Sequence, residues 1–369
     1  MTNREQEILH WIEENPMISQ EELAQRAGIA RSSVAVHIGN LIKKGYLAGK
    51  GYVLRKAPYC VVVGGVNVDI IGTSTNDLVA RDSNPGVVTT TLGGVGRNIA
   101  HNLRLMDVDV RMLTTMGTDA NSEMVLQSCR SLGIDLSRAL RLSDCTTSTY
   151  LCLCSPNGDM ELAVSDMAVC DRITPEYLAS CRSLLQGAGA IVLDANIPAE
   201  TCQWLAENIS VPIYADPVST HKAKKLLPVL GKLHTLKPNR KEAEILSGVA
   251  ITSDNGLPKA ADALLDTGLQ QVFISLGANG VYCANSREKL HLKNLPGTMV
   301  GTTGCGDSFM AAIVRAGMSG MNLEESALMG LAAASITMES SAAINPCLSL
   351  ESMSQRSRLD IPLLPNNKK

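Results

Sequence analysis

The chain has 369 residues, of which 45% are hydrophobic and 19% are charged, and its formal net charge is −3. The length predicts two or three domains, or one large α/β domain with a small appendage, and the composition is that of a globular protein with a sizeable core. The slightly acidic balance excludes a chain that binds nucleic acid along its whole length.

Cysteine usage and hydropathy set expectations for the compartment. The chain has 11 cysteines, but none forms a C-x-x-C pair, and several, such as Cys60 and Cys152, lie inside apolar runs. This pattern favours buried, reduced thiols over a disulfide framework. With no signal peptide and no apolar run long enough to cross a bilayer, we expect a cytoplasmic protein without membrane contact.

Three short helices and a small wing are predicted at the N-terminus. Residues 2–14, 19–29 and 30–47 have apolar positions at helical spacing, and the first two segments begin with capping boxes. Two short strands are expected around Gly49 and Gly51. The capping boxes pair Thr2 with Glu5 and Ser19 with Glu22, and the inward positions of the third helix are Val34, Ile38, Leu41 and Ile42.

A basic segment covers this third helix and the wing. Residues 31–56 contain six Lys or Arg and no Asp or Glu, which on an acidic chain indicates contact with a polyanion. The order of elements over residues 1–56 resembles the winged helix-turn-helix domains, and the resemblance implies that the third helix reads DNA. The alternative is a basic appendage that contacts a protein partner or supports assembly. By resemblance, Arg31, Ser32, Ser33 and His37 contact base edges or phosphates, and Lys43, Lys44 and Lys50 contact the DNA backbone.

A large α/β domain is predicted over residues 57–369. Short apolar runs alternate with helical stretches such as 240–248 and 256–268, which is typical of βαβ units and a parallel sheet covered on both faces. Ligands in such folds bind at the carboxyl ends of the strands. The apolar runs are 60–72, 110–117, 190–196, 211–217, 233–239 and 271–277, and the polar strand-end candidates are Asn67, Asp69, Asn196, Asp216, Lys237, Asn239 and Gly277.

A second, smaller sheet is predicted as a lid. Residues 146–167 alternate in polarity on both sides of Asn157 and Gly158, which is a strong hairpin signal. Residues 84–92 precede a glycine-rich segment and supply a further strand. A small antiparallel sheet beside the parallel one would suit closure over a ligand.

The stretch GTTGCGDSF, residues 301–309, is the most informative motif. Its small residues lead into a helix, so the amide N–H groups of Gly304, Cys305 and Gly306 are expected to be unpaired and to face an anion. Asp307 could accept a proton from a substrate hydroxyl, which suits phosphoryl transfer. From this string alone, a glycine turn with an N-cap aspartate is an equal alternative.

Four further motifs each have a functional and a structural interpretation. Asn239 and Glu242 share a first helical turn, where they could organise the water shell of Mg²⁺ or form a capping box. Asp69, expected at the end of an apolar strand, could bind two sugar hydroxyls or lie in a turn. The segment GGVGRN, residues 93–98, could leave room for a polyhydroxyl ligand or allow close packing. The segment SLGANGVY, residues 275–282, could line a nucleotide pocket or form a tight turn.

Taken in order, these motifs resemble the ribokinase (PfkB) family of carbohydrate and nucleoside kinases over about residues 59–350. Within that family, GGVGRN, KPNRKEAE and VSDMA are most similar to the pseudouridine kinases. The resemblance implies a three-layer α/β/α fold with a mostly parallel sheet and a β lid, in which Asp307 is the base and the amides of residues 304–306 form the anion hole. It implies substrate binding by Asn67, Asp69, Gly93, Gly94, Asn98, Thr149 and Asp166, nucleotide binding by Asn239, Glu242, Ser275, Gly277, Gly280 and Thr302, and Mg²⁺ held through water by Glu242.

One position departs from the family pattern. Gly301 stands where the family commonly has Asp or Asn, in a region that helps to bind a monovalent cation, so activation by K⁺ is not implied for this chain. Cys305 replaces the usual Ala and is small enough to fit.

These residues imply an ATP- and Mg²⁺-dependent kinase that phosphorylates the 5′-hydroxyl of a ribosyl compound, with pseudouridine as the first candidate. Another nucleoside, or a free sugar such as ribose or fructose, is the alternative within this class. A transcription regulator that uses the kinase-like domain as a ligand sensor is the alternative from another class. Because family members often dimerise through the lid, a homodimer is expected.

Overall fold

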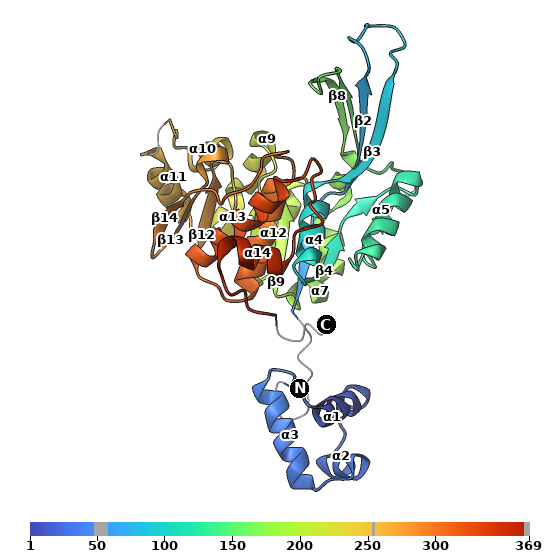
Figure 1. Ribbon diagram of the computed structural model, residues 1–369, viewed down its shortest axis with the longest axis vertical. Coiled ribbons are helices and arrows are strands. Elements are labelled where there is room, and N and C mark those ends of the chain that lie inside the picture. The colour runs from blue at the N-terminus through green and yellow to red at the C-terminus, as the bar shows by residue number, and fades with distance from the viewer. Residues whose placement is uncertain (48–57, 253–254, 365–369) are drawn as a thin grey trace. The chain divides into compact units, whose positions relative to one another are not determined.

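The computed structural model describes residues 1–47, 58–252 and 255–364, which divide into two compact units (Figure 1). The larger unit runs from Tyr59 to Ile361. The smaller unit contains Met1–Pro58 and takes up the end of the chain from Pro362. Among the described residues, no helix is long and apolar enough to cross a membrane.

The small unit contains α1 (Asn3–Glu14), α2 (Gln20–Ala27) and α3 (Arg31–Lys43) around an apolar core. Both predicted capping boxes are present, and α2 ends at the left-handed Gly28 (φ 63°). The prediction that Ile42 faces inward is wrong, because its side chain lies in the last turn of α3 and is 40% exposed. The predicted wing strands around Gly49 and Gly51 lie outside the described residues. The core consists of Ile8, Leu9, Ile12, Ile18, Leu23, Val34, Ile38, Leu41 and Leu47.

The large unit is built on an eight-stranded sheet with the order β14-β13-β12-β11-β10-β9-β1-β4. The six strands from β12 to β4 are parallel, whereas β13 and β14 return antiparallel at one edge. This confirms the predicted mostly parallel sheet. The strands are β1 (Tyr59–Val63), β4 (Asp109–Leu113), β9 (Ala190–Asp194), β10 (Ile213–Asp216), β11 (Thr235–Leu236), β12 (Gln271–Ser275), β13 (Val281–Asn285) and β14 (Lys289–Leu292).

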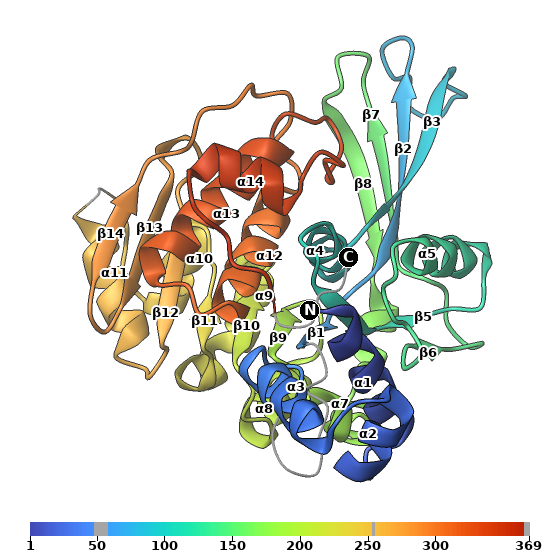
Figure 2. The ribbon, with the colours of Figure 1, turned by 60° about the horizontal axis from the view of Figure 1, so that its bottom comes forward.

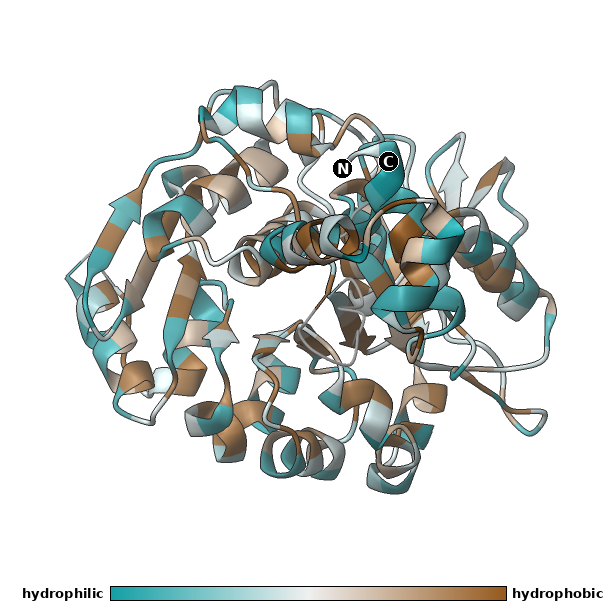
Figure 3. Ribbon diagram, turned by 90° about the horizontal axis from the view of Figure 1, so that it is seen from below, coloured by the Kyte–Doolittle hydropathy of each residue, from teal (hydrophilic) through white to brown (hydrophobic). Residues whose placement is uncertain are grey.

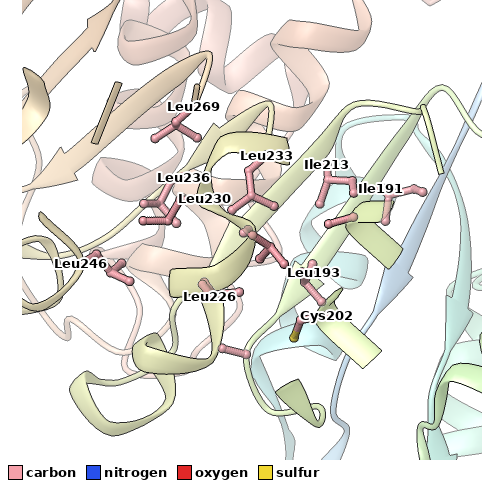
Figure 4. Packing of buried hydrophobic residues seen from close by; sticks show 14 of the residues in the cluster. Ile191, Leu193, Cys202, Ile213, Leu226, Leu230, Leu233, Leu236, Leu246 and Leu269 are labelled. Carbon is pink, nitrogen blue, oxygen red and sulfur yellow. The ribbon is translucent and has the colours of Figure 1, made fainter. Parts of the chain in front are cut away.

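Helices cover both faces of this sheet because its strands are apolar on both sides. On one face, α4 (Val95–Leu105) contacts β1, β4 and β9, and α12 (Cys305–Met318) contacts β9 and β10. The other face packs on the helices between β8 and β12 (Figures 2 and 4). In Figure 3 the central strands are mainly brown, whereas the helices carry both brown and teal residues. The remaining elements are α5 (Ala120–Ser131), η1 (Ala168–Arg172), α6 (Pro175–Ser180), α7 (Arg182–Gln186), α8 (Ala199–Asn208), α9 (Thr220–Ala223), η2 (Lys224–Lys232), α10 (Arg240–Ser247), α11 (Gly256–Leu265), η3 (Gly277–Asn279), α13 (Leu323–Thr337) and α14 (Leu350–Ser357), with a short pair β5 (Thr115–Met116) and β6 (Leu140–Arg141).

A second, four-stranded sheet with the order β3-β2-β7-β8 stands beside the central sheet (Figure 2). Its strands are β2 (Asn67–Ser74), β3 (Gly86–Gly93), β7 (Thr149–Cys154) and β8 (Met160–Asp166). The β7–β8 hairpin predicted around Asn157 and Gly158 is confirmed, with Gly158 at φ 86°. The sheet is not purely antiparallel, because β2 and β7 run parallel. We call this sheet the lid sheet.

Candidate active site

Carboxylates and one lysine meet at the carboxyl ends of β9, β10 and β11. Asp194 and Asp216 end neighbouring strands and are register partners. Lys237, only 6% exposed, follows β11, and its Nζ lies 3.1 Å from Asp216 Oδ2. Burial alone would lower the pKa of Lys237. The ion pair with Asp216 and the nearby carboxylates of Asp307 and Glu242 outweigh this effect, so the lysine pKa is raised.

Asp307 joins this cluster from the first turn of α12. The helix has Gly304 as its N-cap, at φ 81°, so the alternative of an N-cap aspartate is wrong. The carboxylate instead accepts a hydrogen bond from the amide of Asn98 on α4, with Nδ2 2.9 Å from Oδ2. Two helices on the same face of the sheet therefore hold the base candidate between them.

The electrostatic setting of Asp307 suits proton transfer near neutral pH. Dense surrounding protein raises the pKa of its carboxyl to about 7, and the charges of Asp216 and Asp194 add to the rise. The Asn98 hydrogen bond and Lys237 act in the opposite direction. Asp307 as a residue is nevertheless half-buried rather than fully buried.

The glycine turn before α12 presents backbone N–H groups next to this cluster. Within the described part of the chain, the amides of Gly304 and Gly306 donate to no protein acceptor, but the Cys305 amide reaches the Thr302 carbonyl at 3.3 Å. The expectation of three unpaired amides is therefore wrong for Cys305. A Cβ at the exposed Gly306 would lie 3.3 Å from Lys237 Nζ, so the lysine ammonium lies beside the glycine turn.

A second group of predicted residues gathers at the root of the lid sheet. The Asn67 amide donates to Asp69 Oδ1, and Asp69 Oδ2 occupies the space that a Cβ on Gly93 would need. Gly94, at φ 97°, packs against Gly65. Asp69 does not end an apolar strand as expected, because β1 ends at residue 63 and Asp69 is the third residue of β2. Burial raises the pKa of this carboxyl, while Asn67 and the nearby Arg97 lower it.

Asp194 is a site residue that the sequence analysis did not select. It is fully buried, and its Oδ2 accepts the amides of Gly65 (3.0 Å) and Gly96 (2.8 Å), while Oδ1 accepts the amide of Asn196 (3.0 Å). One carboxylate thus fixes the end of β1, the start of α4 and the loop after β9. Its only signal in the sequence is an acid at the end of an apolar run, which it shares with Asp216.

Thr149 and Asp166 do not join these residues. They are register partners on β7 and β8, and Thr149 also pairs with Val68 on β2. Because side chains alternate along a strand, both lie on the face of the lid sheet opposite to Asp69. The Thr149 hydroxyl is bonded within the fold, donating to the Thr147 carbonyl and accepting from Asn121.

The predicted nucleotide residues follow β11 and β12. Asn239 caps α10 and forms a capping box with Glu242. The Oε2 atom of Glu242 accepts a hydrogen bond from the backbone N–H of Asn239 at 2.9 Å. Asn239 also bridges to Ser275 at the end of β12. The segment 275–282 is the predicted strand-turn-strand, with Gly277 and Gly280 at positive φ. Thr302 is exposed next to the glycine turn.

The residues present fit a hard divalent cation. Burial raises the pKa of Glu242, and its Oε1 has no protein donor among the described residues. Asp194, Asp216, Glu242 and Asp307 outnumber Lys237, which favours a cation that keeps several waters. The described residues contain no group of three or more His, Cys, Asp or Glu that could hold a metal directly.

The residues predicted to contact DNA lie on α3 in the small unit. Arg31, Ser32 and Ser33 are exposed, and His37 is half-buried. Lys44 instead forms an ion pair with the buried Glu5 (2.7 Å), which holds the pKa of that carboxyl at about 2. Lys43 is exposed, and Lys50 lies outside the described residues.

Comparison with known proteins agrees with this geometry. A model of the pfkB family of carbohydrate kinases matches residues 57–350, and a model of winged helix-turn-helix DNA-binding domains matches residues 1–48. An uncharacterised sugar kinase of Escherichia coli strain K12, YeiI, is 41% identical over 95% of this chain and 98% of its own length. The pseudouridine kinase of the same organism is 36% identical over 80% of this chain and 96% of its own.

Solved structures share the architecture of the large unit. The ribokinase of Thermotoga maritima superimposes with a TM-score of 0.74 at 25% identity and covers 82% of this chain and 100% of its own. The large unit of this chain, with its mixed central sheet and small second sheet, therefore has the ribokinase-like α/β fold. The chain therefore belongs to the PfkB family of carbohydrate kinases, as a phosphotransferase that uses an alcohol group as acceptor and carries an N-terminal winged helix-turn-helix module.

Proposed function

We propose that this protein transfers the γ-phosphoryl group of ATP to the 5′-hydroxyl of a ribosyl compound, with pseudouridine as its substrate. The observation that carries the proposal is the position of Asp307. It lies in the first turn of α12, is held by Asn98 and has a pKa of about 7 beside the glycine turn. A base so tuned can take a proton at the pH where the enzyme works.

In the proposed reaction, Asp307 accepts the proton of the 5′-hydroxyl as that oxygen forms its bond to the γ-phosphorus. The bond from the γ-phosphorus to the bridging oxygen breaks, and ADP leaves with the electron pair. The amides of Gly304 and Gly306 and the ammonium of Lys237 stabilise the charge on the equatorial oxygens. Mg²⁺, when bound, neutralises the phosphate oxygens, and Asp216 and Glu242 are the residues that would hold it, Glu242 through water.

The substrate class is supported by the lid root and by the relatives. The carboxylate of Asp69 and the amides of Asn67 and Asn98 provide acceptors and donors for sugar hydroxyls, and Gly93 and Gly94 lack the Cβ atoms that would clash with Asp69 and with the loop at Gly65. A relative at 36% identity is named a pseudouridine kinase. Free ribose or another nucleoside would use the same hydroxyl contacts and is the second candidate.

An ATP-consumption screen across nucleosides and pentoses tests this proposal. We expect pseudouridine to give the highest kcat/KM and Asp307→Asn to lower the rate by at least about a hundredfold. If a pentose or another nucleoside is the preferred acceptor, the substrate named above is wrong but the kinase class stands. If Asp307→Asn retains most of the rate, Asp307 is not the base.

We further propose that residues 1–56 bind DNA through α3 and that residues 57–369 form the kinase domain. The exposed side of α3 carries Arg31, Ser32, Ser33 and Lys43, and the apolar Val36 between them is 62% exposed, which suits contact with a thymine methyl. Lys44 contributes less than the sequence suggests, because Glu5 neutralises it. A gel-shift titration against salt, with Lys43→Ala and Arg31→Ala as variants, is the test. Absence of a specific complex at low salt would leave the unit as an assembly module.

The homodimer is proposed through the face of the lid sheet opposite to Asp69. Five large apolar side chains on that face are exposed, which is unusual for a face left in water. Protein cores and obligate interfaces bury such residues. They are Val88 (69% exposed), Leu162 (60%), Val164 (58%), Leu151 (42%) and Leu153 (39%).

A further inference from the structure

Three side chains from separate segments meet beside the end of β1. Lys222 on α9 donates to the Asn196 side-chain oxygen and lies 3.9 Å from the sulfur of Met167, which follows β8 of the lid sheet. Asn196 is only 7% exposed, whereas Lys222 and Met167 are half-buried. We call Lys222, Asn196 and Met167 the lysine cluster.

The lysine cluster lies next to the sugar-binding residues of the lid root. A Cβ on Gly65 would lie 3.4 Å from Met167 Cε and 3.5 Å from Asn196 Nδ2. Gly65 is two residues before Asn67, whose amide bonds Asp69. The same loop that carries the proposed sugar contacts therefore touches the cluster.

The side-chain hydrogen-bond partners of Lys222 within the described residues are neutral. They are the side-chain amide oxygen of Asn196 and the thioether of Met167, and no carboxylate in the described part of the chain forms an ion pair with Lys222. Lys225, three residues on, is instead committed to the fold by its bond to the Ile197 carbonyl (2.9 Å). A half-buried ammonium with two neutral partners retains donor capacity for a third acceptor. Ligand oxygens are the acceptors that such a donor recognises best.

We propose that Lys222 is a specificity-determining residue that donates to a carbonyl oxygen of a ring attached to C1 of the ribosyl substrate, with Asn196 orienting its ammonium. This inference rests on the proposed function and names the ring: an oxygen-bearing heterocycle such as uracil. Met167 supplies an apolar, polarisable surface beside it. The free sugar has no such oxygen, so Lys222 distinguishes a nucleoside from a pentose.

Paired acceptors that differ only in the ring test this assignment. Steady-state kinetics compare pseudouridine with ribofuranosylbenzene, which has a ring of similar shape and no carbonyl. For the unaltered protein we expect pseudouridine to be preferred in kcat/KM. Lys222→Met should lower kcat/KM for pseudouridine by about tenfold to a hundredfold, mainly through KM, the range for a lost hydrogen bond to a charged group. The rate with ribofuranosylbenzene should change less than about twofold.

Two further variants keep the test decisive. Lys224→Met removes an exposed neighbouring lysine and should leave both acceptors unchanged. Lys222→Gln retains an N–H donor and should restore part of the preference for pseudouridine. If Lys222→Met does not fold, Lys222→Gln still tests the role of the donor. Equal effects of Lys222→Met and Lys222→Gln on both acceptors, or no effect on either, would overturn the role of Lys222. Phosphorylation of neither acceptor by the unaltered protein would overturn the proposed function instead.

Discussion

The amide of Asn98 and the carboxylate of Asp307 are 209 residues apart in sequence and 2.9 Å apart in space. The bond joins the first turn of α4 to the first turn of α12, the two helices that pack on the same face of the central sheet. Because the amide donates to the charged form, it lowers the pKa of a carboxyl that burial raises. The pair therefore links the sugar side of the site to the proposed base.

The first prediction concerns the pH dependence of the reaction. In Asn98→Ala the Asp307 carboxylate loses its donor, so its pKa should rise further above 7, against the remaining effects of Asp216, Asp194 and Lys237. The acidic limb of kcat/KM should then move up by about one pH unit. The loss of activity should be larger at pH 6.5 than at pH 9, where only the sugar contact of Asn98 is missing. A loss of equal size at every pH would assign Asn98 to substrate binding alone.

The second prediction concerns stability. A carboxyl with a folded pKa of about 7 and an unfolded pKa near 4 destabilises the fold once it is ionised, so its effect appears as the pH rises from about 4 to about 7. Asp307→Asn should therefore stabilise the protein at pH 8, by at most about 4 kcal/mol and less where the carboxyl is hydrated. The gain should vanish toward pH 4.5. Urea unfolding at the two pH values measures it, and a gain independent of pH would contradict the raised pKa.

Local signals gave the sequence predictions that the structure confirms. The capping boxes of α1 and α2 depend on residues three apart, and the β7–β8 hairpin depends on Asn157 and Gly158 between two alternating runs. Neither needs knowledge of distant segments. The wrong prediction for Ile42 also came from a local signal. Helical periodicity predicts which side of a helix is apolar, but not at which turn the helix stops packing on the core.

Features that depend on distant segments were not predictable. The face on which Thr149 lies is set by the parallel register with β2, which the hairpin sequence does not encode. In the sequence, Asp194 is one of several acids at strand ends. Its role is visible only in the fold, where it accepts the backbone N–H groups of Gly65 and of Gly96 at the start of α4. Lys222 has no motif around it at all. Burial and topology, rather than spacing, select these residues.

The third prediction concerns the buried ion pair. Lys237→Met leaves Asp216 without its partner in a cluster of carboxylates, so the free energy of unfolding should fall by about 3–5 kcal/mol. The double variant Lys237→Met/Asp216→Asn should recover much of the stability and none of the rate, because the ammonium beside Gly306 and the carboxylate proposed to hold Mg²⁺ are both missing. Recovery of both would reduce Lys237 to a structural role.

The fourth prediction concerns monovalent cations. Gly301 has no side-chain oxygen, and a Cβ there would lie 2.8 Å from the Ser340 carbonyl oxygen. We expect the kinase rate to change less than about twofold when K⁺ is replaced by tetramethylammonium at constant ionic strength, which leaves electrostatic screening unchanged. Gly301→Asp should lower the melting temperature, because the added side chain must displace that carbonyl. A loss of most of the activity without K⁺ would place the cation on backbone oxygens instead.

The fifth prediction concerns the lid sheet as a dimer interface. Leu162 and Val88 are aligned across the lid sheet through the cross-strand pairs Leu162–Leu153, Leu153–Gly72 and Gly72–Val88. A lysine at position 162 therefore places a charge within the proposed contact. Leu162→Lys should weaken the dimer by about a hundredfold or more, the effect of a hot-spot change in a buried contact. Met299→Lys, which alters a residue 73% exposed outside the sheet, is the matched control and should leave the dimer intact. Sedimentation equilibrium measures both, and a monomer in the unaltered protein at micromolar concentration would contradict the proposed dimer.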